Sequence, residues 1–253
     1  MRPITNLLPK PLFPVGEKTN IDLIIEQMLK TGIGRIGVNL CHLREKLKSH
    51  LSPYVNKILL SEEEEILGTG GGIRRIAEKA EADCYLIHNG DVYAEVDLER
   101  LIEHHTSHQF PITLVIRAGG SDLGIRGGRV DFDGTGYTYT GIGMIDQRIA
   151  LNLGRDLIPS IQDIVISGLI YDGPWFDLGS PEGYLNCIDH TRGFISPDAE
   201  LTGTRIEGSC YIGARVRIRN GLIRNSVILP ETTLPDGAKI ENAIIAEGSF
   251  INR

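Results

Sequence analysis

Hydrophobic positions divide the chain into two parts with different periods. As far as residue 193, short apolar runs alternate with segments in which apolar residues recur at helical spacing. The apolar runs predict strands at 35–41, 57–60, 84–87 and 111–117, and the helical spacing predicts helices at 20–30, 42–51, 74–80 and 97–108, with Asn20 and Asp97 as N-caps. Strands that alternate with helices predict an α/β domain with a mixed, mainly parallel sheet.

From Phe194 onward the apolar period is shorter. Neither a helix nor simple hairpins fit it, whereas a hexapeptide repeat does: short parallel strands coil as a β-helix around one aliphatic stack. A meander of hairpins is the alternative. The recurring aliphatic positions, five or six residues apart with one gap, are Ile195, Leu201, Ile206, Ile212, Ile218, Ile228, Leu234, Ile240, Ile245 and Ile251.

The two patterns predict two domains, 1–193 and 194–253. The stretch around Leu222 and Ile223 breaks the phase of the repeat, and we expect a loop or corner there. The repeat carries no catalytic residues of its own, so we expect it to support the first domain and to make the contacts of a homo-oligomer.

A carboxylate follows the end of a predicted central strand. The apolar run 84–87 stops at Asn89-Gly90-Asp91, and ligands of open α/β sheets bind at the carboxyl ends of strands. A carboxylate beside a glycine suits a hard divalent cation and phosphate oxygens. An ordinary turn, capped by its own aspartate, is the alternative.

A second carboxylate, Asp177, lies at the edge of a tight Gly-Ser-Pro turn. A helix is expected to begin there with Pro181 at its first position. Two aspartates from distant parts of a chain can clamp one Mg²⁺ between phosphates, so Asp91 and Asp177 are candidate metal ligands. The alternative is that Asp177 only supports its turn.

Two further segments have features of phosphate sites. Pro9-Lys10-Pro11 is stiff and presents the Lys10 ammonium at a defined place, where Arg2 and Lys10 could form a cationic wall. Gly68-Thr69-Gly70-Gly71-Gly72 directly precedes a predicted helix, so its backbone N–H groups could line an anion or nucleotide site. A solvated lysine and a flexible surface loop are the alternatives.

Composition restricts the classes of partner. The net charge of −7 argues against nucleic acid or an anionic membrane surface, since both reward cationic patches. The four cysteines lack paired short spacing, which favours buried reduced thiols. No apolar run has spanning length and no signal peptide is evident, so we expect a cytoplasmic protein.

Four motifs in order resemble those of the sugar-phosphate nucleotidylyltransferases, the NDP-sugar pyrophosphorylases, and the repeat resembles the left-handed β-helix of that family. The motifs are Arg2-Pro3-Ile4-Thr5 with Pro9-Lys10-Pro11-Leu12, then Leu67-Gly68-Thr69-Gly70-Gly71-Gly72, Asn89-Gly90-Asp91-Val92, and Trp175-Phe176-Asp177-Leu178-Gly179-Ser180-Pro181-Glu182. The resemblance implies a Rossmann-like nucleotidyltransferase domain and the Mg²⁺-dependent reaction of an NTP with a sugar 1-phosphate to give an NDP-sugar and pyrophosphate.

The resemblance also implies roles for individual residues. Asp91 and Asp177 would hold Mg²⁺, and Lys10 and Arg2 would contact phosphates. The nucleotide would lie against Gly68 to Gly72, including Thr69, and against Asn89 and Gly90. The sugar phosphate would lie near Gly141 and Asp177. Mannose 1-phosphate with GTP is the first expectation, ahead of N-acetylmuramic or glucose 1-phosphate with UTP or TTP.

The sequence departs from the family pattern in two places. A first strand and a glycine-rich loop ending Gly-Thr-Arg precede the Arg-Pro-Ile-Thr stretch in the family, whereas this sequence starts at Met1, so about a dozen residues are expected to be missing. A Glu-Lys-Pro triplet is also absent between Asp122 and Tyr139. These departures leave open a truncated inactive form, or a non-catalytic subunit that senses nucleotides or nucleotide sugars.

Overall fold

The computed structural model describes residues 1–63 and 65–252. Its chain divides into two compact units. The first unit consists of Met1–Leu23, Gly90–Tyr93 and Trp175–Arg253, and the second consists of Ile24–Asn89 and Ala94–Pro174. The predicted boundary at 193/194 stays a prediction, since the two units divide the chain at other places.

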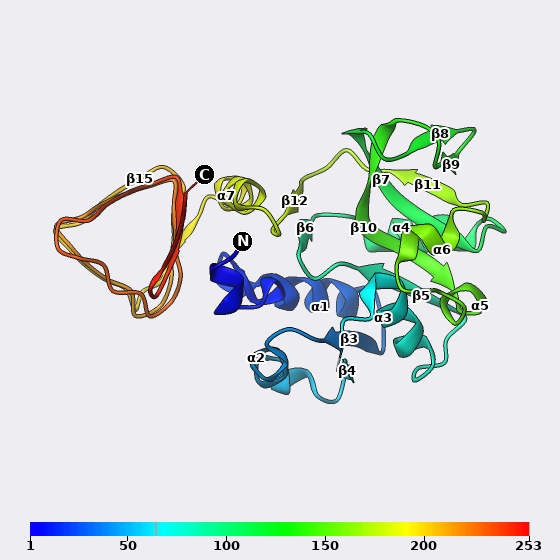
Figure 1. Cartoon of the computed structure of the whole chain (residues 1–253), viewed down its shortest axis with the longest axis horizontal. Coiled ribbons are helices and arrows are strands. Elements are labelled where there is room, and N and C mark those ends of the chain that lie inside the picture. The colour runs from blue at the N-terminus through cyan, green and yellow to red at the C-terminus, as the bar shows by residue number, and fades with distance from the viewer. Residues whose placement is uncertain (64, 253) are drawn as a thin grey trace. The chain divides into compact units, whose positions relative to one another are not determined.

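The second unit is built on two sheets. In one, β3 (Ile36–Leu40) pairs in parallel with β4 (Ile58–Glu62). The other has six strands, in the order β5 (Cys84–His88), β10 (Gly136–Asp146), β7 (Ile112–Gly120), β11 (Ser167–Ile170), β9 (Arg129–Asp131) and β8 (Gly124–Arg126) (Figure 1). In this six-stranded sheet β7 and β11 are parallel and the other pairs are antiparallel.

Across the described residues the sheets are mixed and the parallel pairings are the more numerous, so the predicted α/β class is confirmed. Strand β7 continues to Gly120, and the short hairpin of β8 and β9 follows it.

Helices and an aliphatic core complete the second unit. The helices are α2 (Arg44–His50), the 3-10 turn η3 (Ser52–Tyr54), α3 (Gly68–Ala77), α4 (Leu98–Thr106), α5 (Gln147–Ala150) and α6 (Leu157–Ile161). Asp97 caps α4 as predicted, because its Oδ1 accepts from the Arg100 N–H at 3.0 Å. The inward side chains of β7, among them Ile112 and Ile116, pack with Ile161 of α6.

Helix α1 (Asn20–Lys30) begins in the first unit and ends in the second. Its N-terminus differs from the prediction. Thr19 is the capping residue, because its hydroxyl accepts from the Asp22 N–H at 3.4 Å while the Asp22 carboxylate accepts from the Thr19 N–H at 3.2 Å. This reciprocal pair is a capping box. Asn20 is therefore the first helical residue, and its side chain is free for another contact.

The first unit joins three segments that are distant in sequence. The N-terminal segment holds the 3-10 turns η1 (Ile4–Asn6) and η2 (Lys10–Leu12) and the hairpin of β1 (Pro14–Val15) and β2 (Lys18–Thr19). Strand β6 (Val92–Ala94) pairs with β12 (Trp175–Asp177), and helix α7 (Pro181–His190) follows. Pro181 begins α7 as predicted.

Beyond α7 the chain forms short parallel strands, which lie along the sides of the triangle that successive turns of the chain outline in Figure 1. Three parallel sheets contain β13-β16-β19-β21, β14-β17 and β15-β18-β20, and in most pairs the partner residues are 17 apart, as in Phe194 with Tyr211. These pairings are those that a repeat of parallel strands predicts, and the left-handed β-helix itself stays a prediction. The strands are β13 (Phe194–Ile195), β14 (Glu200–Thr202), β15 (Arg205–Glu207), β16 (Tyr211–Ile212), β17 (Arg217–Arg219), β18 (Leu222–Arg224), β19 (Val227–Ile228), β20 (Lys239–Glu241), β21 (Ala243–Ala246) and β22 (Ser249–Asn252).

Two details of the predicted repeat are wrong. Ile223 does not lie in a loop: it is fully buried in β18, in register between Ile206 and Ile240. Ile251 does not continue the parallel pattern, because β22 turns back and pairs antiparallel with β21.

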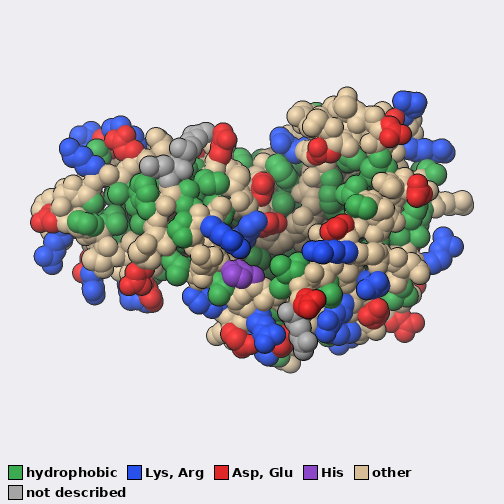
Figure 2. All heavy atoms as spheres, viewed as in Figure 1, with side chains coloured by type: hydrophobic (Ala, Val, Ile, Leu, Met, Phe, Trp, Pro, Cys, Tyr) green, Lys and Arg blue, Asp and Glu red, His purple; other side chains and the backbone are tan. Residues whose placement is uncertain are grey.

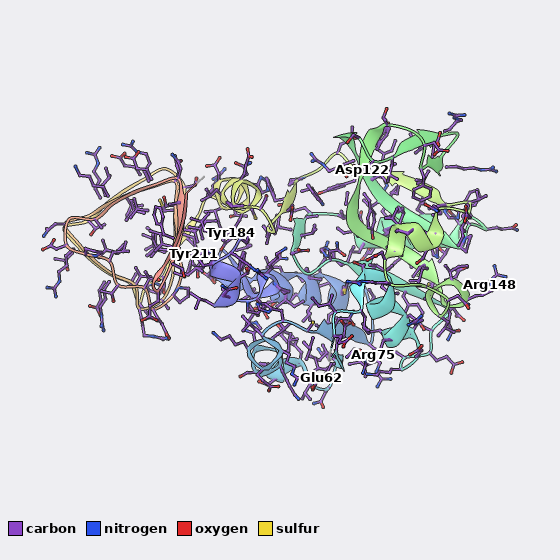
Figure 3. All side chains as sticks on the ribbon, in the orientation of Figure 1. Glu62, Arg75, Asp122, Arg148, Tyr184 and Tyr211 are labelled. Atoms are coloured by element: carbon purple, nitrogen blue, oxygen red, sulfur yellow. The ribbon has the colours of Figure 1, made fainter. Side chains whose placement is uncertain are left out.

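The sheet of β13, β16, β19 and β21 is buried on both faces. Ile212 and Ile228 point to the core inside the parallel strands. On the other face, Tyr211 belongs to a second cluster with Phe13 of the N-terminal segment and Tyr184 of α7 (Figure 3). The N-terminal segment is thus seated on the parallel strands by apolar packing.

Charged residues cover the outside of the parallel strands. Figure 2 shows basic and acidic side chains intermixed there, and an example is the pair Glu200 and Arg217, at 3.3 Å on neighbouring strands. In the part of the chain that the structure describes, no helix is both long enough and apolar enough to cross a bilayer. The four cysteines are free thiols, but only Cys187 and Cys210 are buried as expected, whereas Cys41 and Cys84 are half-buried.

Candidate active site

Lys10 is held by a short turn of the N-terminal segment. Pro9 has extended backbone angles, and the turn η2 begins at Lys10, whose carbonyl accepts from the Phe13 N–H at 2.9 Å. Phe13 is fully buried and stacks on Tyr184 with ring centroids 5.0 Å apart. The segment 1–18 contains two 3-10 turns and no α-helix. The Lys10 ammonium therefore projects from a fixed backbone.

The Asp91 carboxylate faces this ammonium. Lys10 Nζ lies 3.0 Å from Asp91 Oδ2, and the two side chains are 38% and 33% exposed, so both remain accessible to a ligand. The backbone of Asp91 is fixed as well, because its carbonyl accepts from the Leu178 N–H at 2.9 Å. Pro11 lies so close to Gly90 that a Cβ at residue 90 would be 3.0 Å from the Pro11 ring.

Asp177 ends β12 and lies on an exposed turn. Its Oδ1 accepts from the Gly179 N–H at 2.7 Å, and the next residue, Ser180, caps α7 by accepting from the Gly183 N–H at 3.0 Å. A Cβ at residue 183 would lie 2.0 Å from the Asp177 carbonyl oxygen, so only glycine allows the turn to lie this close to the helix. Asp177 thus supports its turn, and its carboxylate remains exposed.

The three side chains converge beside Gly179. The position that a Cβ would take at residue 179 lies 2.7 Å from Asp177 Oδ1, 2.8 Å from Lys10 Nζ and 3.5 Å from Asp91 Oδ2. Two carboxylates and one ammonium from three distant segments therefore surround one point, and the absence of a side chain at residue 179 keeps that point open. The sequence predicts these three residues, and the structure brings them together.

These residues fit a divalent cation that also binds phosphate. A magnesium ion is typically held by one or two protein carboxylates, with phosphates and waters completing its shell. Asp91 and Asp177 supply that number, and no larger group of His, Cys, Asp and Glu with metal-site geometry occurs among residues 1–63 and 65–252. Lys10 contacts Asp91 in this arrangement and is also available to phosphate oxygens.

Arg2 is not part of this group. It is exposed ahead of η1 and forms no ion pair with the acidic residues that the structure describes. Its predicted contact with phosphates stays a prediction.

The glycine-rich stretch is a helix rather than the predicted loop. Gly68 to Gly72 form the first turns of α3, and Gly70, Gly71 and Gly72 are buried. The reason is close packing on a neighbouring segment: the Gly71 N–H donates to the Arg155 carbonyl at 3.1 Å, and a Cβ at Gly70 would lie 2.6 Å from the Gly154 carbonyl oxygen. The predicted nucleotide contact stays a prediction, and Thr69 is the exposed member of the stretch.

Asn89 and Gly141 meet in the second unit. The Asn89 N–H donates to the Gly141 carbonyl at 2.9 Å, and Gly141 has φ +84° at an irregularity of β10. A Cβ there would lie 2.8 Å from the Asn89 amide nitrogen, so glycine permits the contact. The neighbouring His88 donates from Nδ1 to the Asn89 carbonyl at 3.0 Å, and burial lowers its pKa from 6.5 to about 4, which keeps its ring neutral at pH 7.

Three residues that hold the site around Asp91 and Asp177 were not predicted as site residues from the sequence. They are Asn20, Gly179 and Gly183. The Asn20 amide nitrogen donates to the carbonyls of Gly90 and Val92, each at 2.9 Å. Such a contact spans 70 residues and leaves no local signal. Gly179 lies in the motif 175–182 and Gly183 directly follows it, and their close approach to Asp177 could have been suspected from the tight turn alone.

An α/β fold with carboxylates and a lysine at strand ends is typical of proteins that bind phosphorylated ligands. The chain belongs to the nucleotidyl transferase family, whose model matches residues 1–142. The family predicted from the motifs is thereby confirmed, and with it the class of enzyme.

Two relatives match nearly the whole chain. A UTP–glucose-1-phosphate uridylyltransferase of Synechocystis is 26% identical, and the match covers 98% of this chain and 80% of that protein. A mannose-1-phosphate guanylyltransferase of Mycobacterium tuberculosis is also 26% identical, with 98% and 77% covered. Among solved structures, HddC of Yersinia pseudotuberculosis complexed with GMP-PN shares the fold, with a TM-score of 0.61 and 22% identity over 71% of this chain and 88% of that one.

Proposed function

We propose that this protein joins a nucleoside triphosphate to a sugar 1-phosphate and releases pyrophosphate. The observation that carries the proposal is the convergence of Lys10, Asp91 and Asp177 on one open point beside Gly179. Membership of the nucleotidyl transferase family supports the reaction class.

The reaction needs alignment and charge neutralisation rather than a covalent protein nucleophile. An oxygen of the sugar phosphate attacks the α-phosphorus of the NTP, a new P–O bond forms, and the bond from the α-phosphorus to the bridging oxygen breaks as pyrophosphate leaves. Negative charge spreads over the phosphoryl oxygens in the transition state. Lys10, fixed by η2, is positioned to stabilise that charge.

Asp91 and Asp177 would hold Mg²⁺, which when bound supplies Lewis-acid stabilisation of the phosphate oxygens. Asp91 is held through its backbone carbonyl and Asp177 through its Oδ1, so the two carboxylates would present the cation to the phosphates from fixed positions. We further propose that Asn89, Gly90 and the Gly68–Gly71 turn contact the nucleotide and that Gly141 lies near the sugar.

The relatives narrow the substrates to be tested. Their names include a mannose 1-phosphate/guanylyl pair and a glucose 1-phosphate/uridylyl pair. We propose GTP with mannose 1-phosphate first, and UTP or TTP with glucose 1-phosphate next. We also propose that the protein is cytoplasmic, since cytoplasmic NTPs are the donors. We propose that it is a homo-oligomer whose contacts use the parallel strands. The apolar sheet face at Tyr211 is covered within the chain and would not take part in these contacts.

The experiment is an assay of pyrophosphate release with Mg²⁺, the four NTPs and a panel of sugar 1-phosphates. We expect one NTP and one sugar 1-phosphate to give turnover that EDTA abolishes and Mg²⁺ restores. Nucleotide binding without turnover under every combination would contradict the proposal and favour a non-catalytic sensing subunit.

A further inference from the structure

Asn20 is a buried asparagine with an unusual set of contacts. It is 1% exposed, and its amide nitrogen donates to the Gly90 carbonyl and to the Val92 carbonyl, each at 2.9 Å. These two carbonyls lie on either side of Asp91. Both N–H groups of the Asn20 side-chain amide thus donate to the backbone on either side of Asp91.

The same residue is also joined to the segment that carries Lys10. The Asn20 backbone N–H donates to the Phe13 carbonyl at 2.9 Å, and the Phe13 N–H donates to the Lys10 carbonyl at 2.9 Å. Asn20 therefore connects the Lys10 turn to the Asp91 turn through three directed hydrogen bonds of its own. Lys10 and Asp91 then meet at 3.0 Å.

Helix formation does not explain an asparagine here. Thr19 and Asp22 already cap α1, so the Asn20 side chain is not needed as a cap. Its Oδ1 is buried without a hydrogen-bond partner among the described residues. Burying an unpaired acceptor is unfavourable. If the amide were flipped, Oδ1 would face the carbonyl oxygens of Gly90 and Val92, and acceptors would oppose one another. The observed orientation of the amide is therefore required.

We propose that Asn20 is a positioning residue that sets where the Asp91 carboxylate lies against Lys10 and Asp177. The inference rests on the proposed function for its kinetic consequence, but its structural content, the placement of Asp91 beside Lys10, is independent of catalysis. The amide works as a two-pronged donor, and no apolar or acidic side chain of similar size can replace it.

The test uses Asn20→Asp, which keeps the shape but sets a carboxylate oxygen against the two carbonyls. Asn56→Asp, at an exposed position, is the matched control for the added charge. In the pyrophosphate assay, Asn20→Asp is expected to lower kcat by about 100-fold with little change in the KM for the NTP, because a misplaced reacting group affects the transition state more than binding. The control should keep wild-type values.

A second readout does not depend on activity. Acetylation of lysines by acetic anhydride, followed by mass spectrometry, compares Lys10 with the exposed Lys239. Displacing Asp91 breaks the ion pair that occupies the Lys10 ammonium, so Lys10 is expected to be more accessible and to react several-fold faster in Asn20→Asp while Lys239 is unchanged.

Asn20→Ala covers the case in which Asn20→Asp fails to fold, since alanine removes both the donor and the unpaired acceptor. Folded variants with wild-type kcat and unchanged Lys10 labelling would overturn the proposal. If the wild-type protein shows no turnover, the proposed function fails, and the labelling experiment still decides the role of Asn20.

Discussion

At the scale of single residues, the proposed active site depends on the missing side chain at residue 179 as much as on its three charged side chains. Lys10, Asp91 and Asp177 can converge because residue 179 has no side chain. The charged groups themselves are recognisable in the sequence, since carboxylates and lysines near glycine turns are typical of phosphate sites. The need for glycine at 179 is visible only in three dimensions.

We expect Gly179→Ala to impair the enzyme without unfolding it. The new methyl group would lie 2.7 Å from Asp177 Oδ1 and 2.8 Å from Lys10 Nζ, so both must move. A displacement of this kind should lower kcat/KM by about 10- to 100-fold. Gly34→Ala is the matched control, because nothing lies within 4 Å of the added methyl group. Equal losses in the two variants, measured by pyrophosphate release, would contradict the role of Gly179.

At the scale of elements, helix α4 shows how a histidine cluster can be structural. His105 of this helix is buried, with only 4% of its surface exposed. Its Nε2 donates to the Asp146 carboxylate at 3.2 Å, so its Nδ1 accepts from the Thr113 hydroxyl at 2.9 Å. The Thr113 oxygen then accepts from His108 Nε2 at 3.4 Å, and His108 Nδ1 accepts from the Phe110 N–H at 3.2 Å. The two bonds in which a ring Nδ1 accepts, one at His105 and one at His108, require a neutral ring.

The stability of the protein should therefore fall in mild acid. Burial lowers the pKa of His104 and His105 below 6.5, although Asp146 partly opposes the shift at His105. The unfolded chain then binds more protons than the folded chain, so their contribution is complete above pH 6.5 and is lost as the pH falls below it. Each such group contributes a slope of at most about 1.4 kcal/mol per pH unit.

Urea unfolding at pH 7 and pH 5 measures this effect. His105→Gln keeps a polar side chain that does not titrate and should lose less stability between the two pH values than the wild type. His50→Gln, at the end of α2, is the control and should behave as the wild type does. A His105→Gln protein with the wild-type pH dependence would show that this ring does not carry the effect.

At the scale of the whole molecule, most elements and the family were predictable, but the composition of the units was not. Periodicity predicts the strand at β3 and the helix at α4 because each buries one face locally. From hydrophobic spacing alone, Ile223 was predicted to break the phase of the repeat. The prediction failed because the two partners of Ile223 in register lie 17 residues away on either side. Asn225 and Asn242, with φ of 44° and 48° and the same separation, were an overlooked signal of repeated corners.

The three charged residues of the site lie in the same compact unit as the parallel strands. Phe13 and Tyr184 pack on Tyr211, so the segment that carries Lys10 is supported by the C-terminal repeat. No local pattern could show this, since the contact joins residues that are about 200 positions apart in the chain. The support expected from the repeat thus takes the form of this apolar packing on Tyr211.

The most direct measurement is the turnover of Asp91→Asn, Asp177→Asn and the double variant, with the exposed Asp163→Asn as control. If both carboxylates hold one cation, each single variant should lose about 100-fold or more in kcat, and the double variant should lose little beyond the worse single one. The control should match the wild type. Wild-type turnover in Asp91→Asn, or losses that multiply in the double variant, would contradict a shared metal site at the centre of this enzyme.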